Sequence, residues 1–394
     1  MFEDRGIKKK YIVIFFLFWA TNSLSKETNI GKIDAHVELF HYQVSSHLDG
    51  ENLDAKATAL GGYLHYTSTP LYHFGIGVKQ YLSHLIFQSQ NPQSTSLTDA
   101  AGHNINPLAE LNLYYKDDIF HIKAGKQQLQ TPLINDDTTR LIPYSYLGIT
   151  AHIDLDKHSQ LLLGYISEFR ANNSETYTKE SSSGLAEDGV GFIGLYTIFW
   201  DMRAQAYYYF APKLFNAIHL QTESQHKYHD NKTLFYGLQA IYTDKNNGGV
   251  NISNTKNGGG DVKLIAGKLG LRSEKFSYTA SLSYNFGEDG INRGYGGLSS
   301  LYTTAMVTNG KLEGNPFAKS LKVRYTYRNK TYSSAMYLTN VTYKDNTKNT
   351  INSVYIDHKF NFRAREYLLL RFEQQWIKDE RDKSYFRIIS AYDF

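Results

Sequence analysis

The sequence predicts a single closed, antiparallel β-barrel of 18 transmembrane strands over residues 26–394, with 16 strands as the alternative. Three observations predict it. Short runs of alternating apolar and polar residues recur along the chain, no apolar run after residue 25 approaches the roughly 20 residues of a membrane helix, and the chain ends on an aromatic strand. Because only helices and closed barrels satisfy every backbone group inside lipid, these observations together favour the barrel.

The composition excludes several kinds of function. The formal net charge of the 394 residues is +4, and it falls to +2 without the first 25 residues, which carry four basic and two acidic side chains. That balance lacks the concentrated basic face of a nucleic-acid-binding protein. Cysteine is absent, which excludes thiolate metal sites, cysteine nucleophiles and disulfides. The 32 tyrosines and 22 phenylalanines, in a chain of negative mean hydropathy, are typical of a barrel with aromatic girdles and a wet interior.

The first 25 residues have the layout of a secretory signal peptide. Lys8, Lys9 and Lys10 precede an apolar run from Tyr11 to Ala20, and small or polar residues follow. This run is too short to span a bilayer as a helix, so an uncleaved anchor is the less favoured alternative. We expect export through the Sec route, with cleavage within residues 20–27.

The strand pattern is clearest from Phe276 to Phe286, where the even positions are apolar or aromatic and the odd positions are small and polar. Runs of about ten residues between turn signals place 18 strand starts along the chain. They lie near Gly31, Thr58, Tyr72, Leu108, Ile119, Ser145, Ser159, Val190, Arg203, Phe215, Leu234, Asp261, Phe276, Ala318, Tyr332, Ile351, Glu366 and Ser384. The connections alternate between short and long, as periplasmic turns and outer loops do, and the long ones span 44–56, 83–107, 171–188, 242–260 and 287–316. The exception is 211–214, where the alternation requires an outer loop and the sequence has only a tight turn.

The last strand carries a candidate assembly signal. Phe386, Ile388, Tyr392 and the terminal Phe394 share one face, while Arg387 points the other way. This ending resembles the C-terminal signal by which the barrel-assembly machinery recognises outer-membrane barrels, so we expect that machinery to be a partner.

A candidate constriction follows the strand that begins at Phe120. The sequence FHIKAGKQQLQTPLINDDTTRLIPYSYLG breaks at Pro132 into a loop before the next strand opens near Tyr146. We interpret the loop near residues 127–144 as a segment that folds inward and sets the bore of a channel. Charges in a narrow, low-dielectric pore act strongly on a passing ion, which makes Asp136, Asp137 and Arg140 candidate constriction residues. Each has a structural alternative, because adjacent acids often cap turns and an arginine can tie a loop to neighbouring carboxylates.

At this stretch the sequence resembles the OprD family of bacterial outer-membrane porins. The matching residues are Lys123-Ala124-Gly125, Pro132-Leu133, Asp137, Arg140-Leu141-Ile142-Pro143 and Gly148. Thr138 and Thr139 separate Asp137 from Arg140, where the family pattern has a single residue. The resemblance implies an 18-stranded barrel, often a homotrimer, whose third outer loop folds inward and which passes small hydrophilic solutes such as carboxylates, amino acids or short peptides past basic residues on the wall.

The alternation of side chains along each strand predicts which basic residues of the wall point into the barrel, and these residues are the pore-wall candidates. They are Lys79, His121, Lys123, Arg203, Arg324, Arg328, Arg371 and Arg387. The structural alternative for Arg324 and Arg328 is a solvated interior face, since lumen positions are polar by default.

The leading hypothesis is therefore a passive-diffusion porin of the outer membrane of a Gram-negative bacterium, surrounded by outer-membrane lipids and lipopolysaccharide. The sequence lacks the metalloprotease, serine-hydrolase and Walker motifs, and its histidines are dispersed, so we expect no enzyme, cofactor or metal. An outer-membrane lipase barrel is the less favoured enzymatic alternative. The main alternative is a surface-exposed all-β adhesin or binding protein without channel activity.

Overall fold

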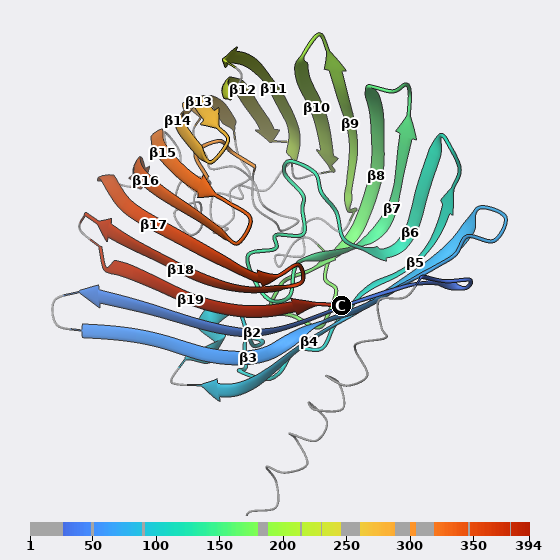
Figure 1. Ribbon diagram of the computed structural model, residues 1–394, viewed down its shortest axis with the longest axis horizontal. Coiled ribbons are helices and arrows are strands. Elements are labelled where there is room, and N and C mark those ends of the chain that lie inside the picture. Colours follow the sequence, from blue (N-terminus) through green and yellow to red (C-terminus); the bar gives the residue numbers. More distant parts are fainter. Residues whose placement is uncertain are drawn as a thin grey trace, which may run out of the picture.

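The described strands of the computed structural model form one closed antiparallel barrel (Figure 1). The structure describes residues 27–48, 51–88, 91–179, 188–212, 215–229, 231–245, 261–287, 300–304, 319–345, 347–378 and 380–394. Each strand from β2 to β19 pairs with the next along the chain, and β19 pairs with β2 to close the sheet. These 18 strands confirm the predicted fold class, and a short strand, β1, pairs with the first two residues of β2.

The strands have the following bounds. They are β1 (Glu27–Thr28), β2 (Gly31–Leu48), β3 (Glu51–Ser68), β4 (Phe74–Gln88), β5 (Leu108–Lys116), β6 (Phe120–Gln127), β7 (Ser145–Asp154), β8 (Ser159–Arg170), β9 (Val190–Phe199), β10 (Met202–Ala211), β11 (Phe215–His229), β12 (Lys232–Lys245), β13 (Val262–Ser273), β14 (Phe276–Asn285), β15 (Lys319–Arg328), β16 (Tyr332–Asp345), β17 (Thr347–Arg363), β18 (Glu366–Ile377) and β19 (Asp382–Asp393). A single 3₁₀ turn, η2 (Pro92–Thr95), is the only helical element in the described part of the chain. None of the described residues forms a helix long and apolar enough to cross a membrane.

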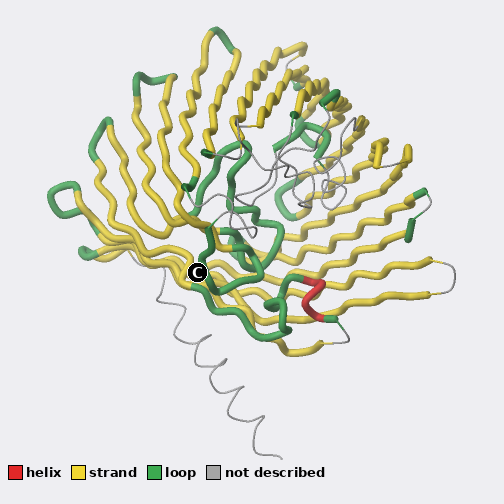
Figure 2. The backbone as a smooth tube through the Cα atoms, turned by 180° about the vertical axis from the view of Figure 1, so that it is seen from behind, coloured by secondary structure: helices red, strands yellow, loops and turns green. Residues whose placement is uncertain are grey.

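The two faces of the barrel wall are opposite in character. On β14, Tyr278 and Leu282 are 55% and 61% exposed on the outer face, whereas Ser281 and Ser283 are buried on the inner face. Successive side chains of a strand point to opposite faces, so the apolar residues form the outer surface that lipid covers and the polar residues face the interior. Figure 2 shows the strands curving around loop segments near the centre.

The strand starts agree with the sequence pattern to within a few residues, with one clear exception. β3 begins at Glu51 rather than near Thr58, and β2 continues to Leu48, so the expected long loop at 44–56 is wrong. Val44 pairs with Ala55 in this part of the hairpin. Backbone pairing does not require apolar side chains, and the alternation that marks a strand in sequence appears only where one face meets lipid. The expected signal peptide, residues 1–25, lies outside the described residues.

Gly62 provides a test of the register between β2 and β3. Its backbone has φ +138°, and an added Cβ would lie 1.9 Å from the carbonyl oxygen of His36. We predict that Gly62→Ala destabilises the barrel by about 1–3 kcal/mol, the usual range for backbone strain of this kind. The folded fraction on unheated gels across a urea titration would measure it.

Gly267→Ala is the matched control, because a Cβ there would meet its nearest neighbour, Leu238 Cδ2, at 3.8 Å. Equal unfolding midpoints for the two variants would contradict the register of this hairpin.

Candidate functional site

The segment between β6 and β7 contacts strands that are far apart in the barrel. The hydroxyl of Tyr209, on β10, donates to Thr131 Oγ1 at 3.0 Å. Arg387, on β19, donates from Nη1 to the carbonyl oxygen of Thr139 at 2.6 Å. β10 and β19 are separated by eight other strands along the chain, so the segment spans a large part of the barrel.

The two acidic candidates of this segment have different surroundings. Asp136 is buried and accepts hydrogen bonds from the side-chain amides of Gln128, at 3.3 Å, and of Gln130. Burial raises the pKa of Asp136 to about 6, although the nearby Lys79 opposes the shift. The Oδ1 atom of Asp137 accepts from the backbone N–H of Thr139 at 3.1 Å, which is the turn-capping geometry of the structural alternative.

Arg140 lies over an aromatic ring of the wall and forms no ion pair with any residue that the structure describes. Its guanidinium lies 5.2 Å from the ring centroid of Tyr42, and the guanidinium of Arg387 lies 4.2 Å from the same ring. Within the described residues no ion pair joins Arg140 to Asp136 or Asp137. The Nε atoms of both arginines are buried without a hydrogen-bond partner there.

A second segment that sequence reasoning missed lies at residues 300–304, inside the long connection between β14 and β15. Tyr302 is buried, and its hydroxyl donates to the carbonyl oxygen of Thr222 at 3.2 Å. The backbone N–H of Ser300 donates to the carbonyl oxygen of Pro132 at 3.1 Å, which joins this segment to the one after β6. The adjacent large side chains of Leu301 and Tyr302 were a sequence signal for this packing.

A strongly basic cavity of about 1090 Å³ is lined by the inner faces of β10 to β18 and by residues of the second segment. Its basic lining residues are Arg203, Lys268, Arg272, Lys275, Lys322, Arg324, Arg328, Lys359 and Arg371, and its acidic ones are Glu223, Glu274 and Asp357. Two of the acids are engaged, because Glu223 pairs with Lys268 at 2.5 Å and Asp357 pairs with Arg371 at 2.8 Å. Basic side chains therefore remain in excess.

Four of the pore-wall candidates line this cavity and four lie elsewhere. Arg203, Arg324, Arg328 and Arg371 are in the lining. Arg387 and Lys79 instead contact the segment after β6, Lys79 through a 2.7 Å hydrogen bond from Nζ to Gln128 Oε1. His121 and Lys123 lie on β6, paired across the sheet with Lys116 and Tyr114.

Sequence reasoning missed about as many basic lining residues as it found. Five of the nine were absent from the candidate set: Lys275, in the turn between β13 and β14, and the four strand residues Lys268, Arg272, Lys322 and Lys359. The signal for the four strand residues was present: Lys268 precedes the outward Leu269, and Arg272 follows the outward Leu271 on the same strand. The same parity rule that found Arg324 would have found them.

A family model and several solved structures place this architecture among known proteins. The model of the family described as "outer membrane porin, OprD family" matches residues 73–367, well over half of the chain. OccK9 (OpdG) of Pseudomonas aeruginosa is a similar solved structure, with a TM-score of 0.82, 14% sequence identity, and coverage of 93% of this chain and 100% of that one. OccAB4 of Acinetobacter baumannii has a TM-score of 0.77 at 16% identity, covering 93% of this chain and 100% of its own.

OpdK of Pseudomonas aeruginosa, solved with vanillate, has a TM-score of 0.77 at 14% identity and covers 92% of this chain and 98% of its own. At such low sequence identities, the structural similarity shows a shared fold and nothing more. A comparison with curated protein sequences found no match.

The raised pKa of Asp136 predicts a titration in the weakly acidic range. The folded protein holds this proton more tightly than the unfolded chain, so acidification from pH 7 to pH 4 neutralises Asp136 and adds stability. We predict a carboxyl protonation with a midpoint near pH 6 in infrared difference spectra of wild type against Asp136→Asn.

Asp117→Asn is the control for that titration. In the turn after β5, hydrogen bonds from the backbone N–H groups of Phe120 and Ile119 lower the pKa of Asp117. Its difference signal should therefore lie below that of an ordinary carboxyl. A midpoint near pH 4 for Asp136 would contradict the burial described above.

Proposed function

The chain belongs to the OprD family of outer-membrane porins, and on this premise we propose that it forms a water-filled channel for passive diffusion of small hydrophilic solutes, with carboxylates, amino acids and short peptides as the preferred class. Membership makes it an outer-membrane channel protein and not an enzyme. Family membership does not give the preferred class of solute. We propose that class from the charged residues of the barrel interior.

The observation that supports this class is the excess of unpaired cations in the basic cavity. Lys322, Arg324, Arg328 and Lys359 line it and form no ion pair within the described residues. Along β15, the side chains from Lys322 to Arg328 extend over roughly 20 Å, given about 3.4 Å per residue of an antiparallel strand. A row of cations in a narrow channel with low-dielectric walls raises the local concentration of anions and guides them inward.

We propose that residues 127–144 cross the lumen and narrow it. The hydrogen bonds of this segment to β4, β10 and β19 support this, because a segment tied to distant parts of a cylinder wall must pass over or through its bore. The second segment, residues 300–304, adds to the obstruction, since it is bonded to Pro132 of the first. In this arrangement Arg140 and Asp136 lie beside the path of the solute.

One of the similar structures agrees with the proposed solute class. OpdK is a solved structure with vanillate, which is a carboxylate. At 14% sequence identity, the similarity of OpdK to this chain shows only a shared fold. Vanillate therefore supports the proposed class of solute and does not specify which solute this chain passes.

The terminal strand fits the proposed assembly signal. Phe386 is exposed on the outer face, and the rings of Tyr392 and Phe394 pack 4.3 Å apart at the seam. The backbone N–H of Phe394 donates to the carbonyl oxygen of Ala35, on β2, at 2.8 Å. We propose that the barrel-assembly machinery binds this strand before it pairs with β2, and that the folded barrel forms the homotrimer implied by the family resemblance.

Planar-bilayer recording of the purified protein tests this function. We predict discrete conductance steps and, under a KCl gradient, a reversal potential that indicates preference for chloride. Closure in steps of one third of the open conductance would support the homotrimer. Neutralising the row on β15 with the double substitution Arg324→Gln and Arg328→Gln should lower the anion-to-cation permeability ratio by about two- to tenfold, because each charge acts in a low-dielectric channel.

Lys330→Gln is the matched control for that experiment. Lys330 is exposed in the turn between β15 and β16, so loss of its one positive charge should leave the permeability ratio nearly unchanged, whereas the single substitution Arg324→Gln, which removes one charge from the wall, should still lower it. Absence of conductance steps would refute the channel. Equal effects of the turn and wall variants would refute the role of the wall cations.

A further inference from the structure

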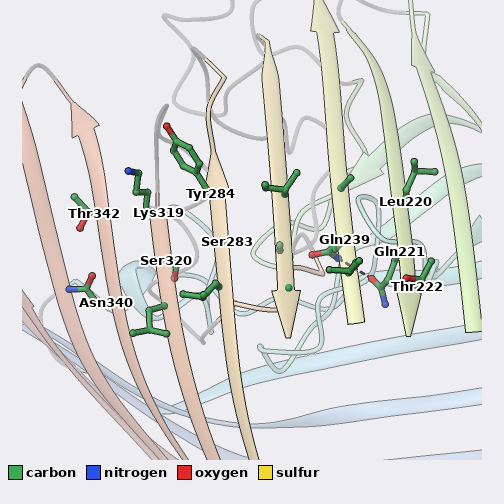
Figure 3. A pocket seen from close by; sticks show the side chains of 17 residues that line it. Leu220, Gln221, Thr222, Gln239, Ser283, Tyr284, Lys319, Ser320, Asn340 and Thr342 are labelled. Atoms are coloured by element: carbon green, nitrogen blue, oxygen red, sulfur yellow. Dashed lines mark hydrogen bonds between the residues drawn. The ribbon is translucent and has the colours of Figure 1, made fainter. Parts of the chain in front are cut away.

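An apolar groove of about 1010 Å³ lies on the outer face of β11 to β16 (Figure 3). Its outward-pointing aliphatic residues are Leu220, Leu238, Ile265, Leu282 and Leu321, which are all exposed. The inner-face residues that border it are engaged on the opposite side of the wall, where Gln239 donates from Nε2 to the carbonyl oxygen of Ser300 at 2.8 Å. The groove therefore opens toward lipid and not toward the lumen.

Two small residues give the groove its depth. Ala240 pairs with Ile265, and Gly267 pairs with Leu238 on one side and Leu282 on the other, so small residues stand between large aliphatic neighbours. A Cβ added at Gly267 would have only two neighbours, both at ordinary contact distance, with Leu238 Cδ2 the nearer at 3.8 Å. The space above Gly267 is thus open, and a larger side chain there would fill it.

Positive charge lies at one end of the groove only. Lys319 is the first residue of β15, its Nζ lies 4.6 Å from the ring centroid of Tyr284, and Figure 3 shows both at the same end. Lys263 is the second residue of β13 and faces outward two positions before Ile265. Neither lysine forms an ion pair within the described residues. Asp244, on β12, is exposed on the same face, so two amines stand near one carboxylate.

This end lies beside the long connections of the barrel. β15 begins after the connection from β14, and β13 begins after the connection from β12; both are among the long ones that outer-membrane barrels place outside the cell. The cationic end is therefore at the level of the outer-leaflet headgroups, and the aliphatic part lies in the hydrocarbon region below it. Such a pattern complements an amphiphile that carries phosphate at its head and saturated chains below.

We propose that this groove is a binding site for lipid A, the phosphorylated glycolipid anchor of lipopolysaccharide. One acyl chain lies in the groove over Gly267 and Ala240, and a headgroup phosphate contacts Lys319 and Lys263. The site is on the outside of the wall, so it is independent of the channel function proposed above.

Native mass spectrometry of the detergent-purified protein with added hexa-acyl, bis-phosphorylated lipid A tests the site, with phosphatidylglycerol as the competing anionic lipid. Wild type should retain lipid A in preference to phosphatidylglycerol. Gly267→Leu, which fills the groove, and Lys319→Glu, which reverses the headgroup charge, should each weaken lipid A binding about tenfold. Ala124→Leu is the matched control, because Ala124 is an exposed outward residue on β6, away from the groove, and this variant should bind as wild type does.

The mobility of each variant on unheated gels would show whether it is folded. If Gly267→Leu assembles poorly, lipid A binding by Lys319→Glu, which changes an exposed residue at the end of a strand, still tests the site. Equal lipid A binding by wild type and both groove variants would overturn the proposal, as would equal or stronger retention of phosphatidylglycerol. Single-channel conductance of the groove variants should equal that of wild type, so failure of this site and failure of the channel are distinguishable.

Discussion

Closure of the sheet between β19 and β2 is the constraint on which the rest of the structure depends. A backbone N–H or C=O group that faces lipid without a partner costs several kcal/mol, so a sheet in a membrane must have no open edge. The seam here runs from the Asp382–His47 pair to the Asp393–His36 pair, and the N–H of Phe394 extends it to Ala35. Once the seam is closed, every strand has one face toward the interior and one face toward lipid. Because side chains alternate along a strand, the alternating sequence then places polar residues on the first face and apolar residues on the second.

The closed wall also determines what the interior can hold. Inner positions on β15 and β18 carry Lys322, Arg324 and Arg371, which would be costly in lipid but are tolerated beside water. Tyrosines on the same face give the connecting segments polar anchors: Tyr209 bonds to the segment after β6, and Tyr302 reaches from its own segment to β11. The charged inner face and the tyrosine anchors of these segments are thus consequences of one topology.

The strands of the barrel wall were well predicted from the sequence, because lipid on one side requires an apolar residue at every second position. The sequence pattern located the first residue of β14 and gave the inward direction of Arg203 and Arg324. Where lipid is absent the signal disappears, which explains why β3 was expected to begin seven residues too late. Contacts between segments distant in the chain also leave no local pattern.

For that reason the packing of residues 300–304 was missed, and the partners of Asp136, Asp137 and Arg140 could not be read from the sequence. In the structure Asp136 is bonded to glutamines of its own segment, while Arg140 lies against Tyr42, on β2. Only the folded chain could show which of these groups meet.

Thiol labelling of adjacent positions on β14 tests the orientation of the wall most directly, and the absence of native cysteine leaves no background. Thr279 lines the basic cavity, and Ala280 is exposed on the outer face. In membranes, a charged, membrane-impermeant thiol reagent should modify the Thr279→Cys variant at least about 100-fold faster than Ala280→Cys, because only a hydrated thiol forms the reactive thiolate. Equal rates, or faster labelling at position 280, would contradict a barrel with a wet interior and a lipid-covered exterior.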